Sequence, residues 1–165
     1  MAEVENLFIV EELVRAIASH MGYDPNVSFN NVYDFVHQLF DKQIQKQICQ
    51  SVVAVLKYTL NVAEISKKDE ELAKESLNTL FSNLNYDSVK SDIEKKFMDV
   101  KESGDYKQII RIFNEKGISK SIGKFIEGID CRQYCQTVVN LVRRGNNTII
   151  DAIINYLPDT NRIPR

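Results

Sequence analysis

Apolar side chains recur at spacings of three and four residues along most of this 165-residue chain, which predicts a succession of α-helices. The first stripe predicts a helix over residues 3–21, with Gly22 in the position that commonly ends a helix. Its apolar positions are Val4, Leu7, Phe8, Val14, Ile17, Ala18 and Met21. Residues 23–26 then form a predicted turn, since Asp24 precedes a proline and is thereby restricted to extended backbone.

The next apolar stripe runs from a capping serine, Ser28, to about Leu60. Residues 28–62 contain no glycine or proline, so the pattern is consistent with one long helix or with two. Because an average helix has about 11–12 residues, we expect two helices that meet near Asp41 and Lys42. Residues 52–56 are apolar on every side, which predicts a central, buried helix.

Capping side chains and glycines divide the rest of the chain into further helices. Ser66, followed by acidic residues, predicts the start of a helix whose apolar stripe runs from Leu72 to Leu84. Asp87 or Ser88 predicts the start of the next, which ends before Gly104. Four more begin at Asp105, Ser119, Asp130 and Asn147 or Thr148, and end at Gly117, Gly128, Gly145 and Pro158.

This succession predicts an all-α protein: a single compact bundle of eight or nine helices around the central apolar helix. The chain has only 6 glycines and 3 prolines, which argues against the many turns of an all-β fold. It is 44% hydrophobic with a net charge of −2, so it can build a core. We expect one domain over residues 1–158 and a flexible tail over residues 159–165.

The cysteines and the first residues bear on the compartment. The acidic start lacks the features of a signal peptide, no apolar run is long enough to span a membrane, and the cysteine count is odd. These features predict a cytoplasmic protein, with a secreted form as the alternative. Cys131 and Cys135 lie one helical turn apart, too far for a disulfide. With Cys49 they are expected to be buried apolar side chains, the alternatives being a redox link to Cys49 or a metal site.

Charge is distributed unevenly along the chain. The net charge is −4 over residues 1–65, −2 over residues 66–102 and +4 over residues 103–165. This basic last third suggests contact with an acidic partner, whereas the alternative is an ordinary solvated surface. The candidate partner-binding cations are Lys120, Lys124, Arg143 and Arg144. A sequence pI near 5.7 argues against nucleic acid as the partner.

The sequence contains no recognisable catalytic, metal-binding or cofactor-binding motif. Its two histidines have simpler expected roles, His20 at a helix end and His37 on a polar helix face. The adjacent acids Glu11–Glu12 and Glu70–Glu71 are expected to be solvated or to face helix N-termini. We therefore expect no enzyme, no cofactor and no metal.

The remaining hypothesis is a non-catalytic intracellular adaptor or regulator that binds another protein, with a groove for a partner's amphipathic helix. The first alternative is a helical carrier of a lipid or another apolar small ligand. The second and less favoured alternative is an enzyme that uses carboxylates, lysines or tyrosines. Ile153 and Ile154 in the last helix are candidates for either the core or a partner interface, including a homodimer.

Overall fold

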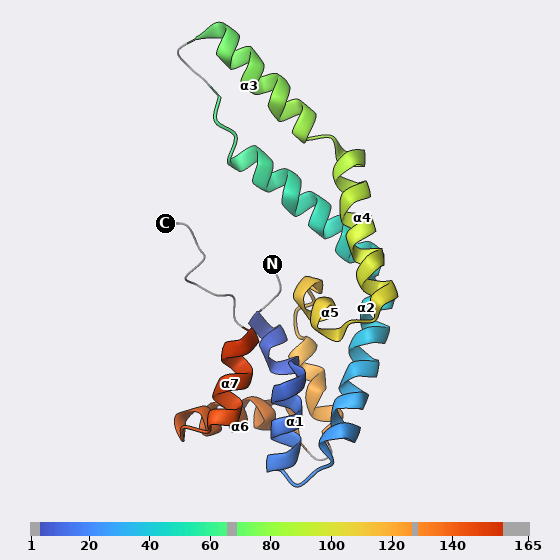
Figure 1. The fold of residues 1–165 in the computed structure, drawn as a ribbon, viewed down its shortest axis with the longest axis vertical. Coiled ribbons are helices and arrows are strands. Elements are labelled where there is room, and N and C mark those ends of the chain that lie inside the picture. Colours follow the sequence, from blue (N-terminus) through green and yellow to red (C-terminus); the bar gives the residue numbers. More distant parts are fainter. Residues whose placement is uncertain (1–3, 66–68, 127–128, 157–165) are drawn as a thin grey trace. The chain divides into compact units, whose positions relative to one another are not determined.

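The computed structural model describes residues 4–65, 69–126 and 129–156, and within these residues it is all-helical, without strands. The α-helices are α1 (Glu11–His20), α2 (Pro25–Asn61), α3 (Glu70–Asn83), α4 (Tyr86–Ser103), α5 (Tyr106–Ile112), α6 (Cys131–Arg143) and α7 (Asn147–Tyr156). Two 3-10 helices, η1 (Val4–Ile9) and η2 (Ile118–Lys124), complete the described elements (Figure 1). The all-α class is confirmed, but the described residues contain seven α-helices where eight or nine were expected.

The chain divides into two compact units. Unit 1 contains residues 1–40 and 105–165, and unit 2 contains residues 41–104, so the second unit is inserted within the sequence of the first. The single domain over residues 1–158 stays a prediction, and the predicted tail over residues 159–165 lies outside the described residues.

Unit 1 is built from α1, α5, α6, α7, the two 3-10 helices and the first part of α2. In its packing α7 contacts both α1 and α6, while η2 contacts α6 and η1. The largest completely enclosed side chains are aromatic residues, isoleucines and one leucine, and they come from all of these elements. They include Ile9, Leu13, Ile17, Phe40, Ile109, Ile110, Phe113, Ile122, Ile126, Tyr134 and Ile149.

Hydrogen bonds from distant side chains hold the segment η1 in the core of unit 1. The Tyr106 hydroxyl donates to the carbonyl of Ile9 at 2.6 Å, and the Tyr134 hydroxyl donates to the carbonyl of Phe8 at 2.7 Å. In the opposite direction, the fully buried Asn6 amide donates to two carbonyls in and just after α5, each at 2.7 Å. Hydrogen bonds therefore join η1 to the last third of the chain in both directions.

The predicted helix over residues 3–21 is wrong in its first half, because η1 is a 3-10 helix and α1 begins only at Glu11. Val10 between them has extended backbone, with φ −58° and ψ 134°. The carbonyls of Phe8 and Ile9 accept hydrogen bonds from tyrosine hydroxyls. These tertiary hydrogen bonds satisfy groups that a continuous helix would pair within itself.

Some predicted helix ends in unit 1 are confirmed, but the expected cap Ser28 lies inside α2, which begins at Pro25, and α5 ends at Ile112 and not at Gly117. The Asp105 carboxylate accepts from the backbone of Lys107 and Gln108, and Asp130 forms a capping box with Gln133. Gly145 follows α6 with φ +72°, a conformation that glycine adopts without strain. The element expected after Ser119 is the 3-10 helix η2, and its expected end at Gly128 lies outside the described residues.

Unit 2 consists of the second part of α2 together with α3 and α4. Its buried apolar side chains come from α2 and α4 and are Ile44, Ile48, Val52, Phe97 and Val100. An ion pair between Lys101 and Asp41, with 3.2 Å between nitrogen and oxygen, joins the same two helices. By contrast, α3 has no buried side chain.

The prediction of two helices meeting at Asp41 and Lys42 is wrong, because α2 is one continuous helix of 37 residues. Nothing in its sequence interrupts it, and its buried stripe passes through the expected break in steps of four residues. That stripe contains Val32, Val36, Phe40, Ile44, Ile48 and Val52. Helices lengthen readily when no residue breaks them, so the average length was a poor guide.

The expected central, buried helix over residues 52–56 is also contradicted. Val52 is completely buried, but Val53 is 40% exposed and Val55 is 43% exposed. The apolar composition of this segment is therefore not explained by burial within the chain.

The start of α3 also differs from the prediction. Asp69 caps α3 by accepting from the backbone of Leu72, while the expected cap Ser66 lies outside the described residues.

The start of α4 also differs from the prediction. Asn85 caps it by accepting from the backbone of Ser88, so the helix begins earlier than a cap at Asp87 or Ser88 would allow. The amide of Asn85 accepts this hydrogen bond as well as a carboxylate would, since asparagine and aspartate are equally good caps.

Replacing Asn6 by alanine is expected to lower the free energy of unfolding by about 1–3 kcal/mol, because its two buried hydrogen bonds to the carbonyls of Ile110 and Phe113 are lost. Urea denaturation followed by circular dichroism measures the change. Asn30→Ala, at an exposed position in α2, is the matched control and should shift stability by no more than about 0.5 kcal/mol. Equal effects of the two substitutions would contradict the role assigned to Asn6.

The buried tyrosines are expected to make unit 1 sensitive to alkali. Burial raises the pKa of Tyr106 and that of Tyr134, so the folded chain keeps both phenolic protons after the unfolded chain has released them. Their stabilisation is complete below the unfolded pKa of about 10 and is lost as the pH rises further, by about 1.4 kcal/mol per pH unit for each tyrosine. Tyr106→Phe should reduce this slope in denaturation measured from about pH 9 to about pH 11. An unchanged slope would contradict the prediction.

Candidate functional site

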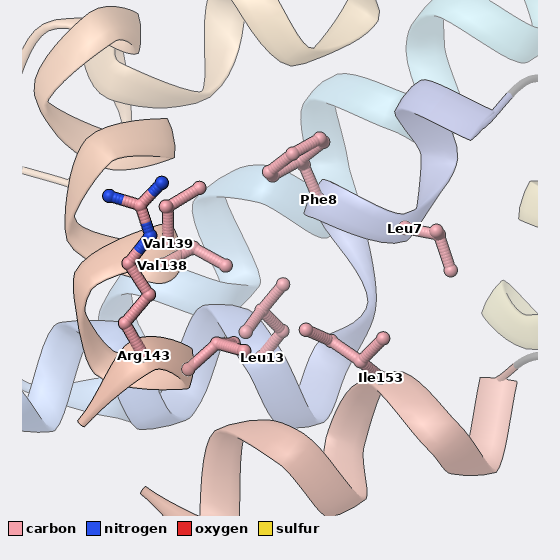
Figure 2. A pocket seen from close by; sticks show the side chains of 8 residues that line it. Leu7, Phe8, Leu13, Val138, Val139, Arg143 and Ile153 are labelled. Atoms are coloured by element: carbon pink, nitrogen blue, oxygen red, sulfur yellow. The ribbon is translucent and has the colours of Figure 1, made fainter. Parts of the chain in front are cut away.

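Unit 1 contains an apolar pocket of about 360 Å³ between η1, α1, α6 and α7 (Figure 2). This volume is near the lower end of the range of about 300–1,000 Å³ typical of ligand pockets. Seven of the eight lining residues are apolar, and the eighth is an arginine. The lining residues are Leu7, Phe8, Leu13, Val138, Val139, Val142, Arg143 and Ile153.

Helix α6 provides half of this lining because its apolar surface is wider than its buried stripe. Tyr134, Val138 and Leu141 face the core, whereas Val139 and Val142 are 39% and 37% exposed. The pocket is therefore open to solvent along α6.

The opposite wall is positioned by Tyr134, which lies one turn before Val138 on α6. Its hydroxyl holds the carbonyl of Phe8, and its ring contacts the Phe8 ring edge to face, with 6.5 Å between the ring centroids. One buried side chain thus fixes an aromatic residue of η1 at the pocket. The shape of the pocket depends on the same contacts that hold η1 in the core.

Arg143 is the only charged residue in the lining. A guanidinium donates up to five hydrogen bonds and stays protonated, so it favours a carboxylate or phosphate next to the apolar space. The pocket thus combines a surface for an apolar group with a fixed positive charge. Among the described residues that line it, there is no carboxylate, imidazole, thiol or hydroxyl side chain.

Two of the six predicted partner-binding residues, Arg143 and Ile153, are brought together by this pocket. Ile154 is 58% exposed but does not line it. Lys120 and Lys124 are exposed on η2, and Arg144 is exposed at the end of α6, all outside the lining. Of the four predicted partner-binding cations, Arg143 is the one that lies among the described lining residues.

Four of the lining side chains were expected only as residues of an apolar helix face, namely Leu7, Phe8, Val138 and Val142. Leu13 and Val139 had no expected role. The available signal was the pair Val138–Val139 together with Val142, which makes the apolar face of α6 too wide for a single contact. No comparable signal links residues 7 and 8 to α6, since more than 120 residues separate them.

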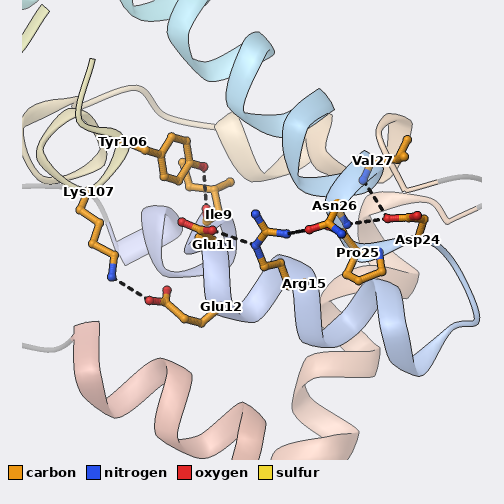
Figure 3. A network of polar contacts seen from close by, with 10 residues as sticks. All are labelled: Ile9, Glu11, Glu12, Arg15, Asp24, Pro25, Asn26, Val27, Tyr106 and Lys107. Atoms are coloured by element: carbon orange, nitrogen blue, oxygen red, sulfur yellow. Dashed lines mark hydrogen bonds and ion pairs between the residues drawn. The ribbon is translucent and has the colours of Figure 1, made fainter. Parts of the chain in front are cut away.

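A second cluster of charged groups lies where α1 faces the starts of α2 and α5 (Figure 3). Arg15 bonds Glu11 at 2.8 Å and the side chain of Asn26 at 2.7 Å, and its guanidinium lies 4.6 Å from the centre of the Phe29 ring. Lys107 bonds Glu12 at 2.8 Å. These contacts join α1 to α2 and to α5.

The charges in this cluster are held fixed by their partners. Burial alone raises the pKa of Glu12, but the hydrogen bond and the charge of Lys107 outweigh it, so the pKa lies below its usual value. The hydrogen bond from Lys107 to Glu12 raises the pKa of the lysine. Both groups therefore stay charged at neutral pH, which suits an ion pair and not an acid or base that exchanges protons.

Among the described side chains, the histidines and cysteines do not form a common site. His20 is exposed in the last turn of α1. His37 is half-buried, with 5.7 Å between the centroids of its ring and the Tyr33 ring. Cys49 is exposed and Cys135 is half-buried, which contradicts the expected burial, because Cys49 lies outside the buried stripe of α2. The side chain of Cys131 lies outside what the structure describes.

The described residues contain neither a candidate metal site nor a candidate membrane-spanning helix. No group of three or more histidine, cysteine, aspartate or glutamate residues among them could hold a metal ion. Within the same residues, no helix combines the length and the apolarity that crossing a membrane requires.

Comparison with protein-family models, with curated proteins and with solved structures returned no match for this chain. Any functional assignment therefore depends on the geometry of the pocket and of the surrounding surface.

The ion pair between Lys107 and Glu12 is expected to contribute at most about 1 kcal/mol, since both side chains are about half exposed. Its contribution is present above the unfolded pKa of Glu12, about 4.3, and is lost as the pH falls through the lower folded pKa. Lys107→Ala should therefore weaken the fold slightly at neutral pH and not at about pH 2. Lys116→Ala, at an exposed position, is the control in the same urea denaturation series.

Proposed function

We propose that this protein is a non-catalytic adaptor or regulator whose unit 1 binds an amphipathic segment of a partner protein. The observation that carries the proposal is the apolar pocket open along α6, with Arg143 as its only charged lining residue. An apolar side chain of the partner occupies the pocket, and a carboxylate near it on the partner pairs with the guanidinium.

The exposure of the lining favours a protein segment over a lipid. Pockets for small ligands bury about 70–90% of the ligand surface. Here Val139 and Val142 remain more than one-third exposed, and the volume of about 360 Å³ is small for a long acyl chain. A partner helix covers such exposed rims while it inserts one anchoring side chain. The lipid carrier is thus the second candidate, and the test separates the two.

The test is a selection of displayed peptides on the purified wild-type protein, with counter-selection on Val139→Trp, which places a bulky ring in the mouth of the pocket. Selected peptides should share apolar residues at helical spacing with an acidic residue beside them. Val139→Trp should weaken their binding about 10-fold or more, measured by fluorescence anisotropy. Val27→Trp, at an exposed position of α2 outside the pocket lining, is the matched control and should bind normally.

The charge is tested by a second matched pair. Arg143→Glu should weaken the selected peptides, whereas Arg144→Glu, one residue further on and outside the lining, should leave them nearly unchanged. Peptides that bind Val139→Trp as well as they bind wild type would contradict the proposal. Native mass spectrometry that finds a fatty acid bound to wild type but absent from Val139→Trp would contradict it in favour of the carrier.

A further inference from the structure

Unit 2 leaves an unusual amount of apolar surface uncovered at the end of α2 and on α3. Eight large apolar side chains between residues 53 and 81 are at least 40% exposed, and Tyr58 and Phe81 are exposed to 68% and 66%. The set is Val53, Val55, Tyr58, Leu60, Val62, Ile65, Leu72 and Phe81. Apolar patches of this kind on a folded chain mark interaction sites.

On α2 the exposed side chains continue a stripe that is buried earlier in the same helix. Ile48 is 2% exposed, but Val55, which follows it after seven residues, is 43% exposed. Steps of seven return to nearly the same side of an α-helix. The helix therefore keeps a core-type surface beyond the point where the rest of unit 2 covers it.

On α3 the apolar surface is wider than one neighbouring helix can cover. Ala73, Leu77, Leu80 and Leu84 form a half-buried stripe, and Leu72 and Phe81 extend the apolar arc on its two sides. At 100° per residue this arc spans about 180°, whereas a helix that faces one core needs about 100°. Within the described residues of unit 2, the end of α2 faces α3 across a cleft. Its lining includes the apolar Val62, Leu72 and Leu80 and, at the rim of the neutral segments, Glu64 and Glu75.

The end of α2 and the second half of α3 are almost free of charge in a chain that is 27% charged, whereas the first half of α3 carries Glu70, Glu71, Lys74 and Glu75. Residues 47–63 contain Lys57 as their one charged residue, and residues 76–86 contain none. We call these two segments the neutral hairpin. Loss of charged residues together with exposed tyrosine and phenylalanine is the composition of the centre of a protein interface.

We propose that the neutral hairpin is a self-association surface, on which a second copy of this chain places its own neutral hairpin. Two such hairpins related by a twofold axis form a four-helix arrangement, in which the all-apolar end of α2 gains neighbours on its open sides. A neutral surface is complementary to its own copy, because the contact opposes no like charges. A basic or acidic partner would find almost no counter-charge on it.

Exposed side chains of the neutral hairpin supply much of the area that a stable dimer needs. Tyr58 and Phe81 are two-thirds exposed, so together they offer roughly 200–330 Å² when the full burial of each such ring is about 150–250 Å². Four more apolar side chains of the neutral hairpin add to this area, namely Val53, Val55, Leu60 and Val62. A standard interface buries about 800 Å² on each partner, and these six side chains account for a substantial part of it. This inference concerns unit 2 and does not depend on the pocket in unit 1.

The test is sedimentation equilibrium of the full-length chain over a concentration series. Wild type should approach twice the monomer mass of 19.0 kDa. Tyr58→Glu and Phe81→Glu, tested separately, should each raise the dimer dissociation constant about 10-fold or more, since each places a charge at the centre of the contact. Val27→Glu, with a 58% exposed valine in the first part of α2, is the matched control and should remain dimeric.

Circular dichroism distinguishes dissociation from unfolding, because residues that are two-thirds exposed can be replaced without loss of helix content. A folded, monomeric Tyr58→Glu beside a dimeric Val27→Glu supports the proposal. Wild-type chain that stays monomeric at every concentration overturns it, as does a dimer that both hairpin variants leave intact. Neither outcome affects peptide binding at the pocket, so the two proposals can fail separately.

Discussion

The architecture of unit 1 depends on the burial of two tyrosine hydroxyls against main-chain carbonyls of η1. A phenol buried without a partner destabilises a fold, and so does a carbonyl. Tyr106 and Tyr134 satisfy both needs at once at Ile9 and Phe8, and Asn6 completes the connection from the other side. These bonds account for the interrupted first helix, for the enclosed position of η1, and for the wall that Phe8 contributes to the pocket.

Local signals in the sequence were sufficient for much of the fold. The caps at Asp105 and Asp130 and the left-handed Gly22 and Gly145 could be predicted because each depends on residues within one turn. The break at Asp41 was wrong since nothing local requires it. The bond from Tyr134 to Phe8 spans 126 residues, and no helical periodicity encodes such a pairing. For the same reason Arg143 and Ile153 could be proposed singly, but their shared pocket could not.

The two units use apolar surface in different ways. In unit 1 the apolar stripes of several elements converge, and the part that stays open is a small concavity beside one cation. In unit 2, α3 has no buried side chain, and the apolar surface of α2 continues beyond Val52, its last buried residue. The apolar run over residues 52–56 was therefore wrongly interpreted as a buried helix, since Val53 and Val55 are exposed. Composition reports what a surface is suited to contact, and it does not say which molecule provides the contact.

The order of the units along the chain has a consequence for biosynthesis. Residues 41–104 form a continuous unit, so they can complete their contacts while the ribosome is still translating. The first 40 residues must wait for the last third of the chain, because the bond to Phe8 needs a donor 126 residues later. At about 5–20 residues per second this delay lasts roughly 6–25 s. During that time the apolar side chains of the first 40 residues lack the later elements of unit 1 that bury them in the folded chain.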